Sequence, residues 1–91
     1  MQGDVAYQIR FHREARKEIE ALADADYERI SAVLDLLQET PRPGGSLKLA
    51  GHDLWRMRVG RHRMIYEIAD ATQTILILRI ALRTERTYRN L

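Results

Sequence analysis

The sequence predicts an α+β domain in which two N-terminal helices pack on one face of a small antiparallel sheet, in the order β-α-α-β-β-β. Three observations lead to this class. An alternating apolar stretch opens the chain, two amphipathic stretches follow it, and the second half contains three strand-like stretches. The 91 residues suffice for one domain, 1–91, and neither a repeat nor a linker divides them.

The first strand and the first helix are separated by a change of period. Apolar residues occupy the odd positions of 5–11, which is typical of a half-buried strand. After His12, the apolar residues Ala15, Ile19 and Leu22 recur at helical spacing among charged residues. This pattern predicts an amphipathic helix on the surface of the domain.

A second helix is expected between the region of Asp24 and Pro41. Asp24 and Asp26 are both suitable N-cap residues, and apolar residues recur at helical spacing after them. Pro41 ends the helix because the residue before a proline is pushed out of the α region. Residues 41–46 contain two prolines and two glycines and therefore predict a loop.

Residues 54–68 predict a β-hairpin around which the rest of the chain is organised. Apolar and charged residues alternate up to Val59, and Gly60-Arg61 then supplies a two-residue turn with glycine first, the signature of a type II′ turn. Counting outward from this turn predicts the opposite residues of the two strands: Val59 with His62, Arg58 with Arg63, Met57 with Met64, Arg56 with Ile65 and Trp55 with Tyr66.

This register gives the hairpin an apolar face, expected in the core, and a basic face. The apolar face consists of Trp55, Met57, Val59, Met64 and Tyr66, and the basic face of Arg56, Arg58 and Arg63. Like charges placed opposite each other destabilise a sheet, so we expect the basic face to bind something negative. A solvated sheet face is the simpler alternative.

Residues 74–82 predict the last strand. It is apolar on nearly both faces and therefore suits a central position in the sheet. Arg79 and Arg83 have the same parity and are expected on one face. The tail that follows contains Arg86 and Tyr88 and is compatible with a short helix or an extended end.

Charge and composition narrow the class of protein. Residues 1–47 contain six Lys and Arg against nine Asp and Glu, whereas 48–91 contain nine against four, so the basic second half indicates a polyanionic partner. The absence of cysteine suits a reducing cytoplasm, and no apolar run is long enough to span a membrane. No metal-binding motif is present, and we expect no metal or other cofactor.

Several short motifs accompany the hairpin in a fixed order: Tyr7-Gln8-Ile9-Arg10-Phe11, Ala15 with Lys17-Glu18-Ile19, Pro41-Arg42-Pro43, Lys48-Leu49-Ala50-Gly51, Ile80-Ala81-Leu82-Arg83 and Tyr88. Together with the hairpin, their order and spacing resemble the RelE/ParE superfamily of bacterial toxin–antitoxin systems over almost the whole chain. RelE-like toxins of that superfamily are endoribonucleases that cleave messenger RNA in the ribosomal A site and so inhibit translation. ParE-like toxins inhibit DNA gyrase and lack the nuclease residues.

The RelE-like branch matches better, and the resemblance then implies a catalytic site of Arg56, Arg58, Arg63, Arg83 and Tyr88. It also implies metal-independent cleavage, in which the ribose 2′-OH attacks the adjacent phosphate and leaves a 2′,3′-cyclic phosphate. Fixed guanidinium groups suit this chemistry because they stabilise charge that develops on phosphate oxygens. Further RNA contacts are expected from Lys48, Arg61, Arg79 and Arg86.

The general base remains open between two residues. Lysines are common in the superfamily at the positions of Arg56 and Arg58, but arginine stays protonated and cannot accept the proton. Tyr88 is the first candidate, since a phenol among arginines ionises more easily. His62 is the second, although its counted position lies on the apolar face. The missing lysines predict a slow catalyst that relies on the ribosome.

The resemblance also implies partners and two competing interpretations. We expect a RelB-like antitoxin, whose acidic or amphipathic segment covers the arginines in a toxin–antitoxin hetero-oligomer, and we expect the ribosome and messenger RNA as targets. The first alternative is a ParE-like gyrase inhibitor without nuclease activity. The second is a binding module with decayed catalysis that is kept for its antitoxin.

Overall fold

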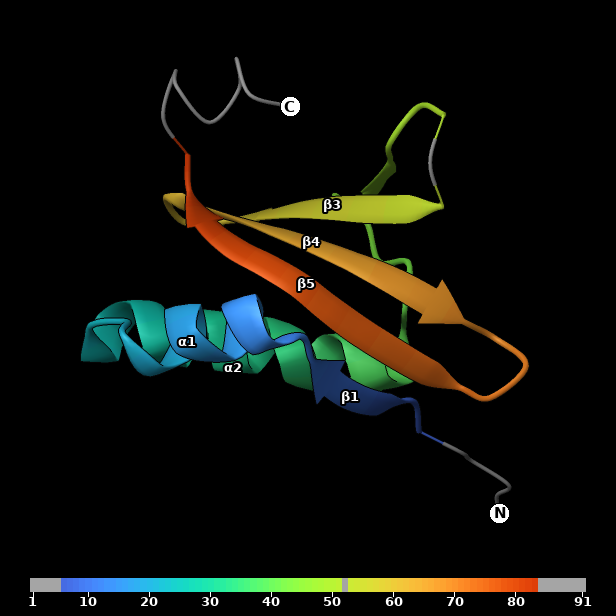
Figure 1. Ribbon diagram of the computed structural model, residues 1–91, viewed down its shortest axis with the longest axis horizontal. Coiled ribbons are helices and arrows are strands. Elements are labelled where there is room, and N and C mark those ends of the chain that lie inside the picture. The colour runs from blue at the N-terminus through green and yellow to red at the C-terminus, as the bar shows by residue number, and fades with distance from the viewer. Residues whose placement is uncertain (1–5, 52, 84–91) are drawn as a thin grey trace.

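The computed structural model describes residues 6–51 and 53–83, and its two helices lie together on one side of strands β3–β5 (Figure 1). The α+β class is confirmed. The elements, in chain order, are β1 (Gln8–Phe11), α1 (Arg13–Glu20), α2 (Asp24–Glu39), β2 (Leu47–Lys48), β3 (Leu54–Val59), β4 (His62–Ala69) and β5 (Thr74–Leu82).

The five strands form one sheet in the order β1-β5-β4-β3-β2. The sheet is mixed rather than wholly antiparallel, because β1 pairs parallel with β5 while all other neighbours are antiparallel. A long connection through both helices separates β1 from the rest of the sheet, so no tight turn imposes antiparallel pairing on it. The short strand β2, absent from the expected order, pairs with the start of β3.

The hairpin of β3 and β4 has the predicted register. Each of the five pairs obtained by counting from the turn is present, from Val59 opposite His62 to Trp55 opposite Tyr66. Gly60 has a φ of 61°, and Arg61 is not among the residues with positive φ, as a type II′ turn requires. Glycine is needed at the first position because an L side chain rarely adopts this conformation.

A β-bulge in β5 changes which residues of this strand face the core. Ile65 pairs with Arg79 and Tyr66 pairs with Ile77, so Leu78 is an extra residue in β5. Before the bulge, Ile77 is fully buried in the core, and after it Ile80 takes that role. The alternation therefore slips by one residue. Arg79 and Ala81 pair with Ile65 and Arg63 on the face away from the helices, but the Arg79 side chain extends at the strand edge to Glu18 of α1.

The core lies between the helices and one face of the sheet, which we call the core face. Ala15, Ile30 and Leu37 from the helices are fully buried against core-face residues such as Met64 and Tyr66. We call the opposite face the distal face. In the described ranges, neither helix is long and apolar enough to cross a membrane.

The start of α2 differs from the expected cap. The N-cap residue is Ala23, which makes no capping hydrogen bond through its side chain, so the prediction of Asp24 or Asp26 as the N-cap is wrong. Asp24 and Asp26 instead occupy the first turn, where the helix dipole favours negative charge. Asp26 is buried there, with 8% of its surface exposed.

Helix α1 lies beside the part of β5 that extends past β1. The pairing with β1 ends at Phe11 opposite Ile77. Three residues further along β5, the backbone N–H of Ile80 donates to the Glu18 carboxylate at 2.7 Å, and Arg79 donates to the same carboxylate. Glu18 therefore fastens α1 to this edge of the sheet.

Candidate arginine site on the distal face

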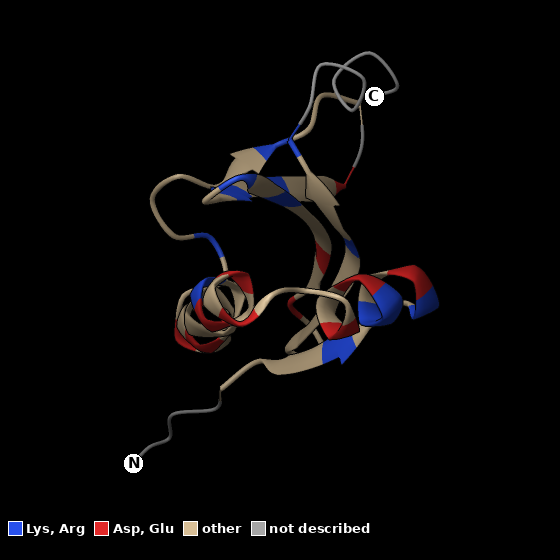
Figure 2. Ribbon diagram, turned by 90° about the vertical axis from the view of Figure 1, so that its left-hand side faces the viewer, with Lys and Arg blue, Asp and Glu red and all other residues tan. Residues whose placement is uncertain are grey.

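The distal face carries three of the predicted site residues. Arg58 and Arg63 are direct cross-strand neighbours, and Arg56 lies two residues before Arg58 on β3. Side chains alternate along a strand, so all three project from the face opposite Met64 and Tyr66. Figure 2 shows several Lys and Arg positions grouped on the strands at the top of the view, whereas other Lys and Arg positions lie on the helices together with most of the Asp and Glu positions.

The three arginines differ in exposure. Arg63 is buried, with 3% of its surface exposed, Arg56 is half-buried and Arg58 is exposed. On the other side of Arg63 its β5 neighbour is Ala81, whose small side chain leaves room for the guanidinium group. The site thus combines a buried, positionally restricted guanidinium group with two that reach solvent.

Arg83 follows β5 and is tied to the hairpin turn. Its backbone N–H donates to the Arg61 carbonyl at 2.8 Å, and its Nη1 donates to the Gly60 carbonyl at 3.2 Å. Arg58 and Arg63 lie close to this turn, with only four residues between them in the sequence. The contacts with the turn therefore hold Arg83 at the same end of the sheet as the Arg58–Arg63 pair.

Two of the predicted RNA-contacting arginines are engaged with helix carboxylates. Arg61 Nη2 lies 3.4 Å from Asp26 Oδ2. Arg79 donates to Glu18 from Nε at 3.1 Å and from Nη2 at 2.8 Å, and this hydrogen bonding raises the pKa of the Arg79 guanidinium above its ordinary value. In this structure both side chains fasten the sheet to the helices.

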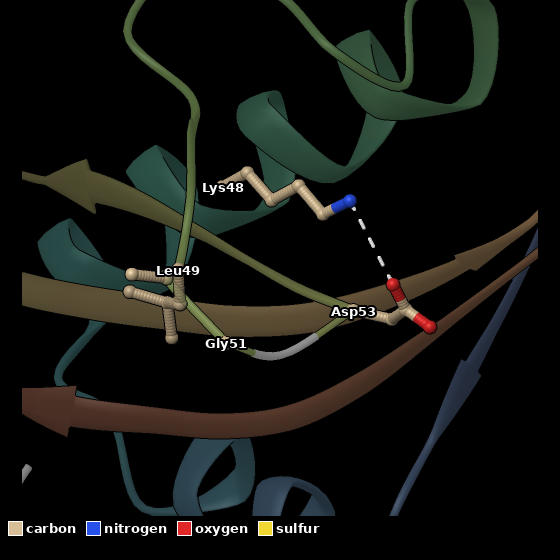
Figure 3. A pocket seen from close by; sticks show the side chains of 5 residues that line it. Lys48, Leu49, Gly51 and Asp53 are labelled. Atoms are coloured by element: carbon tan, nitrogen blue, oxygen red, sulfur yellow. Dashed lines mark ion pairs between the residues drawn. The ribbon is translucent and has the colours of Figure 1, made fainter.

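Lys48 lies apart from the arginines. It pairs with Trp55, so the register places it on the opposite face from Arg56. Its ammonium group points towards Asp53, 3.7 Å from Oδ1, across an open hollow also lined by Leu49 and Gly51 (Figure 3). Both charged side chains are exposed.

Of the two candidates for the general base, His62 is among the described residues and Tyr88 is not. His62 is 5% exposed and shares the parity of Met64 and Tyr66, so it lies on the core side as the counted register predicted. It lines a groove between α1 and β5 together with Leu22, Arg79 and Ile80. Tyr88, like the predicted RNA contact Arg86, lies outside the described residues.

One cluster at the other end of the sheet was not predicted. Asp70, in the turn between β4 and β5, accepts hydrogen bonds from the Tyr7 hydroxyl at 2.6 Å and from both terminal nitrogens of Arg42 at 3.3 and 2.8 Å. Arg42 also lies over the Trp55 ring, 5.2 Å from its centroid. The guanidinium group of Arg42 and the Tyr7 hydroxyl lower the pKa of Asp70, and Asp70 in turn raises the pKa of Tyr7.

We call these four residues, Tyr7, Arg42, Trp55 and Asp70, the Asp70 clasp. They join the start of β1, the loop after α2, β3 and the turn before β5. Tyr7 and Asp70 are 63 residues apart in the sequence, and Arg42 and Asp70 are 28 apart. No local sequence pattern therefore predicts these contacts. Because its guanidinium group contacts a carboxylate and an indole ring, Arg42 has a structural role and stabilises the fold.

Comparison with known proteins identifies the class to which this fold and this arginine face belong. A family model described as the ParE toxin of a type II toxin–antitoxin system, parDE, matches residues 9–87. The chain belongs to this family and is thus a toxin of the RelE/ParE superfamily, so the resemblance seen in the sequence is confirmed. Among curated protein sequences, none matches the chain.

Solved structures agree with this assignment. The archaeal RelE–RelB complex from Pyrococcus horikoshii is 29% identical, with a TM-score of 0.76 and coverage of 88% of this chain and 98% of that one. The intact E. coli RelBE toxin–antitoxin complex is 23% identical, with a TM-score of 0.77 and coverage of 88% and 100%. A YoeB/ParE toxin from Agrobacterium tumefaciens is 20% identical, with a TM-score of 0.74 and coverage of 85% and 99%.

Proposed function

We propose that this toxin is a ribosome-dependent endoribonuclease of the cytoplasm that cleaves messenger RNA in the A site. The observation that carries the proposal is the pairing of Arg58 with Arg63 on the distal face, with Arg56 beside them and Arg83 held at the same end of the sheet. Arg58 is exposed and Arg56 is half-buried, so a phosphate backbone can reach these two side chains. The register and the exposure of Arg56 and Arg58 support the same conclusion.

The proposed reaction needs no metal ion. The 2′-oxygen attacks the adjacent phosphorus, the bond from phosphorus to the 5′-oxygen breaks, and a proton passes from the attacking to the leaving oxygen through the general base and acid. Arg63 stabilises the charge that develops on the phosphate oxygens. Arg56 and Arg58 bind the phosphates, and Arg83 neutralises the leaving oxygen.

We assign the proton transfer to Tyr88 rather than to His62. Support comes from the position of His62, which is buried on the core side of the sheet and separated from the arginines by the sheet itself. A general base must reach the proton that it removes, so geometry takes precedence over pKa. Replacement of Tyr88 by Phe is expected to slow cleavage much more than replacement of His62 by Gln.

We also propose a RelB-like antitoxin as the partner, since several structural neighbours are toxin–antitoxin complexes. A segment with acidic side chains complements the exposed charge of Arg56 and Arg58 and would cover the site in a hetero-oligomer. Reversing the charge of both residues to Glu should weaken capture of the neighbouring gene product. Unchanged capture would mean that the antitoxin neutralises the toxin without covering this face.

Induced expression of the chain tests the nuclease proposal, with and without its neighbouring gene, followed by mapping of message ends. We expect cuts within codons of translated messages, and none in the same messages when their start codons are removed. Intact messages in arrested cells would overturn the proposal. Association with ribosomes should also weaken steeply with salt, because phosphate contacts release counterions.

A gyrase inhibitor is the second candidate function, and the match to the ParE family model favours it. The absence of lysine from the paired strand positions 56 and 58 points the same way, since both residues are arginines that cannot act as a base. In that case arrested cells would contain intact messages, form filaments and show altered supercoiling of plasmid DNA. The message-end experiment therefore separates the two functions.

A further inference from the structure

We infer that Asp26 is a positioning residue for the arginine site, through its contact with the hairpin turn; the catalytic part of this inference rests on the proposed nuclease function. Asp26 is in the first turn of α2 and is 8% exposed. Its two carboxylate oxygens contact Arg61 Nη2 at 3.4 Å and Arg29 Nη1 at 3.5 Å. It therefore joins the helix layer to the tip of the β3–β4 hairpin.

The hairpin turn packs directly on the beginning of α2. A Cβ atom added to Gly60 would lie 3.5 Å from Arg29 Cδ and 3.7 Å from Arg29 Nη1, which is ordinary van der Waals contact. Arg29 thus lies against the turn and is also bound to Asp26. Asp26 and Arg29 together form the surface of α2 on which Gly60 and Arg61 pack.

The same two turn residues hold Arg83. The Arg61 carbonyl accepts the backbone N–H of Arg83 at 2.8 Å, and the Gly60 carbonyl accepts Arg83 Nη1 at 3.2 Å. A turn that shifts on α2 therefore moves both acceptors of Arg83 at once. A misplacement of about 1 Å can lower a reaction rate by up to ~100-fold, so the position of the turn on α2 affects the rate of cleavage.

A buried carboxylate is well suited to this task. Burying a charge is unfavourable unless it is paired, and Asp26 has two guanidinium partners and the N-terminal dipole of α2. The pairing also holds the Arg61 side chain towards the helix layer. A cation that would otherwise compete for phosphate is thereby kept away from Arg58 and Arg63.

Hydrogen exchange of the Arg83 backbone amide tests the positioning without reference to activity. We expect Asp26→Asn to lower the protection of this amide at least ~10-fold relative to the amides of β4 and the first half of β5, which report on global opening. The matched control is Asp24→Asn, which removes an exposed carboxylate from the same helical turn. Unchanged protection of Arg83 in Asp26→Asn would overturn the inference, as would equal loss in the control.

Cleavage of ribosome-bound message tests the consequence for catalysis. We expect Asp26→Asn and Arg61→Gln each to lower kcat by about 10- to 100-fold with little change in KM, because the site would be misplaced rather than lost. The double variant should be no slower than the slower single variant, since both act through one contact. Losses that multiply, or a change confined to KM, would overturn the inference.

The two measurements separate failure of the inference from failure of the proposed function. If the unaltered chain cleaves no message but Arg83 loses protection in Asp26→Asn alone, the nuclease proposal is rejected and the positioning of Arg83 by Asp26 stands. If the unaltered chain cleaves and Asp26→Asn cleaves equally fast, the nuclease proposal stands and the positioning role is rejected. Global unfolding of Asp26→Asn is recognised by the β4 amides, and Arg61→Gln then supplies the same comparison.

Discussion

Residues 62–66 of β4 are buried on both faces of the sheet, yet the two faces have different roles. On the core face, Met64 and Tyr66 have no exposed surface and pack with the helices. On the distal face, Arg63 and Ile65 are 3% and 9% exposed, but their cross-strand neighbours include Arg56 and Arg58. Burial alone therefore does not separate the core from the candidate site. The register does, because neighbours one residue apart belong to opposite faces.

Replacing Met64 by Ala should have the largest effect on stability and should spare the distal face. We expect the free energy of unfolding to fall by about 2–5 kcal/mol, because a fully buried side chain is truncated and leaves a cavity. Urea unfolding measures the loss, with Leu36→Ala as the control, since Leu36 is 44% exposed on α2. Full toxicity per folded molecule is expected, and a selective loss of activity would show that the two faces are coupled.

Replacing Arg63, the residue before Met64 on β4, should reduce activity and leave the stability of the fold largely unchanged. We expect Arg63→Ala to lower message cleavage by about 100- to 1000-fold, because a fixed donor to the phosphate oxygens is lost. The fold should remain, as measured by urea unfolding. Arg10→Ala is the matched control, since Arg10 is an exposed arginine of the same face on β1. Growth arrest that survives Arg63→Ala would remove the site from this face.

Replacing Glu18 by Ala should weaken the attachment of α1 to the sheet. The carboxylate accepts hydrogen bonds from Arg79 and from the Ile80 backbone. We expect a loss of about 1–2 kcal/mol, since bonds to charged groups are strong but the Arg79 side chain is half exposed and screened by water. Thermal unfolding measures it against Glu20→Ala, an exposed acid of the same helix. Equal stability of the two variants would show that the edge contact contributes nothing.

Replacing Asp70 by Asn should give the smallest effect, and one that depends on pH. Arg42 and Tyr7 lower the pKa of Asp70 in the folded chain, so the ionised carboxylate stabilises the fold. This contribution is complete above the ordinary aspartate value of about 3.9 and is lost as the pH falls through the lowered folded value. Urea unfolding should therefore show the unaltered chain as more stable than Asp70→Asn at pH 7.

Acid should remove that difference. The advantage of the unaltered chain is expected to shrink only below about pH 4, where the unfolded carboxyl begins to take up its proton. Asp35→Asn, which alters an exposed acid of α2, serves as the control. An advantage that persists undiminished in strong acid would exclude the carboxylate of the Asp70 clasp as its source.

Local patterns predicted the hairpin and the face that carries the arginines. A two-residue turn with glycine first leaves a single way to count the opposite residues, so Arg58 falls opposite Arg63 without any knowledge of the rest of the fold. Changes in the period of the apolar residues predicted the order of the helices and of all strands except the short β2. The roles assigned to the distal arginines in catalysis remain predictions.

Contacts between distant segments were beyond such patterns. Arg79 and Glu18 are 61 residues apart, and Arg61 and Asp26 are 35 apart, so the sequence gives no sign that these arginines are paired with helix carboxylates. The parallel pairing of β1 with β5 has no turn to signal it. The bulge at Leu78 was hidden because, apart from Thr74 and Arg79, every residue of β5 is apolar, so the alternation of side chains did not fix the register.

The contact between Glu18 and the Ile80 backbone has a consequence for the solubility of the molecule. A strand edge with unsatisfied N–H groups is a template on which another chain can add a strand, and such additions lead to aggregation. By accepting the Ile80 N–H, a charged side chain from α1 blocks part of the edge that β1 leaves uncovered. One glutamate thus protects the sheet from self-association at an edge where the described part of the chain places no further strand.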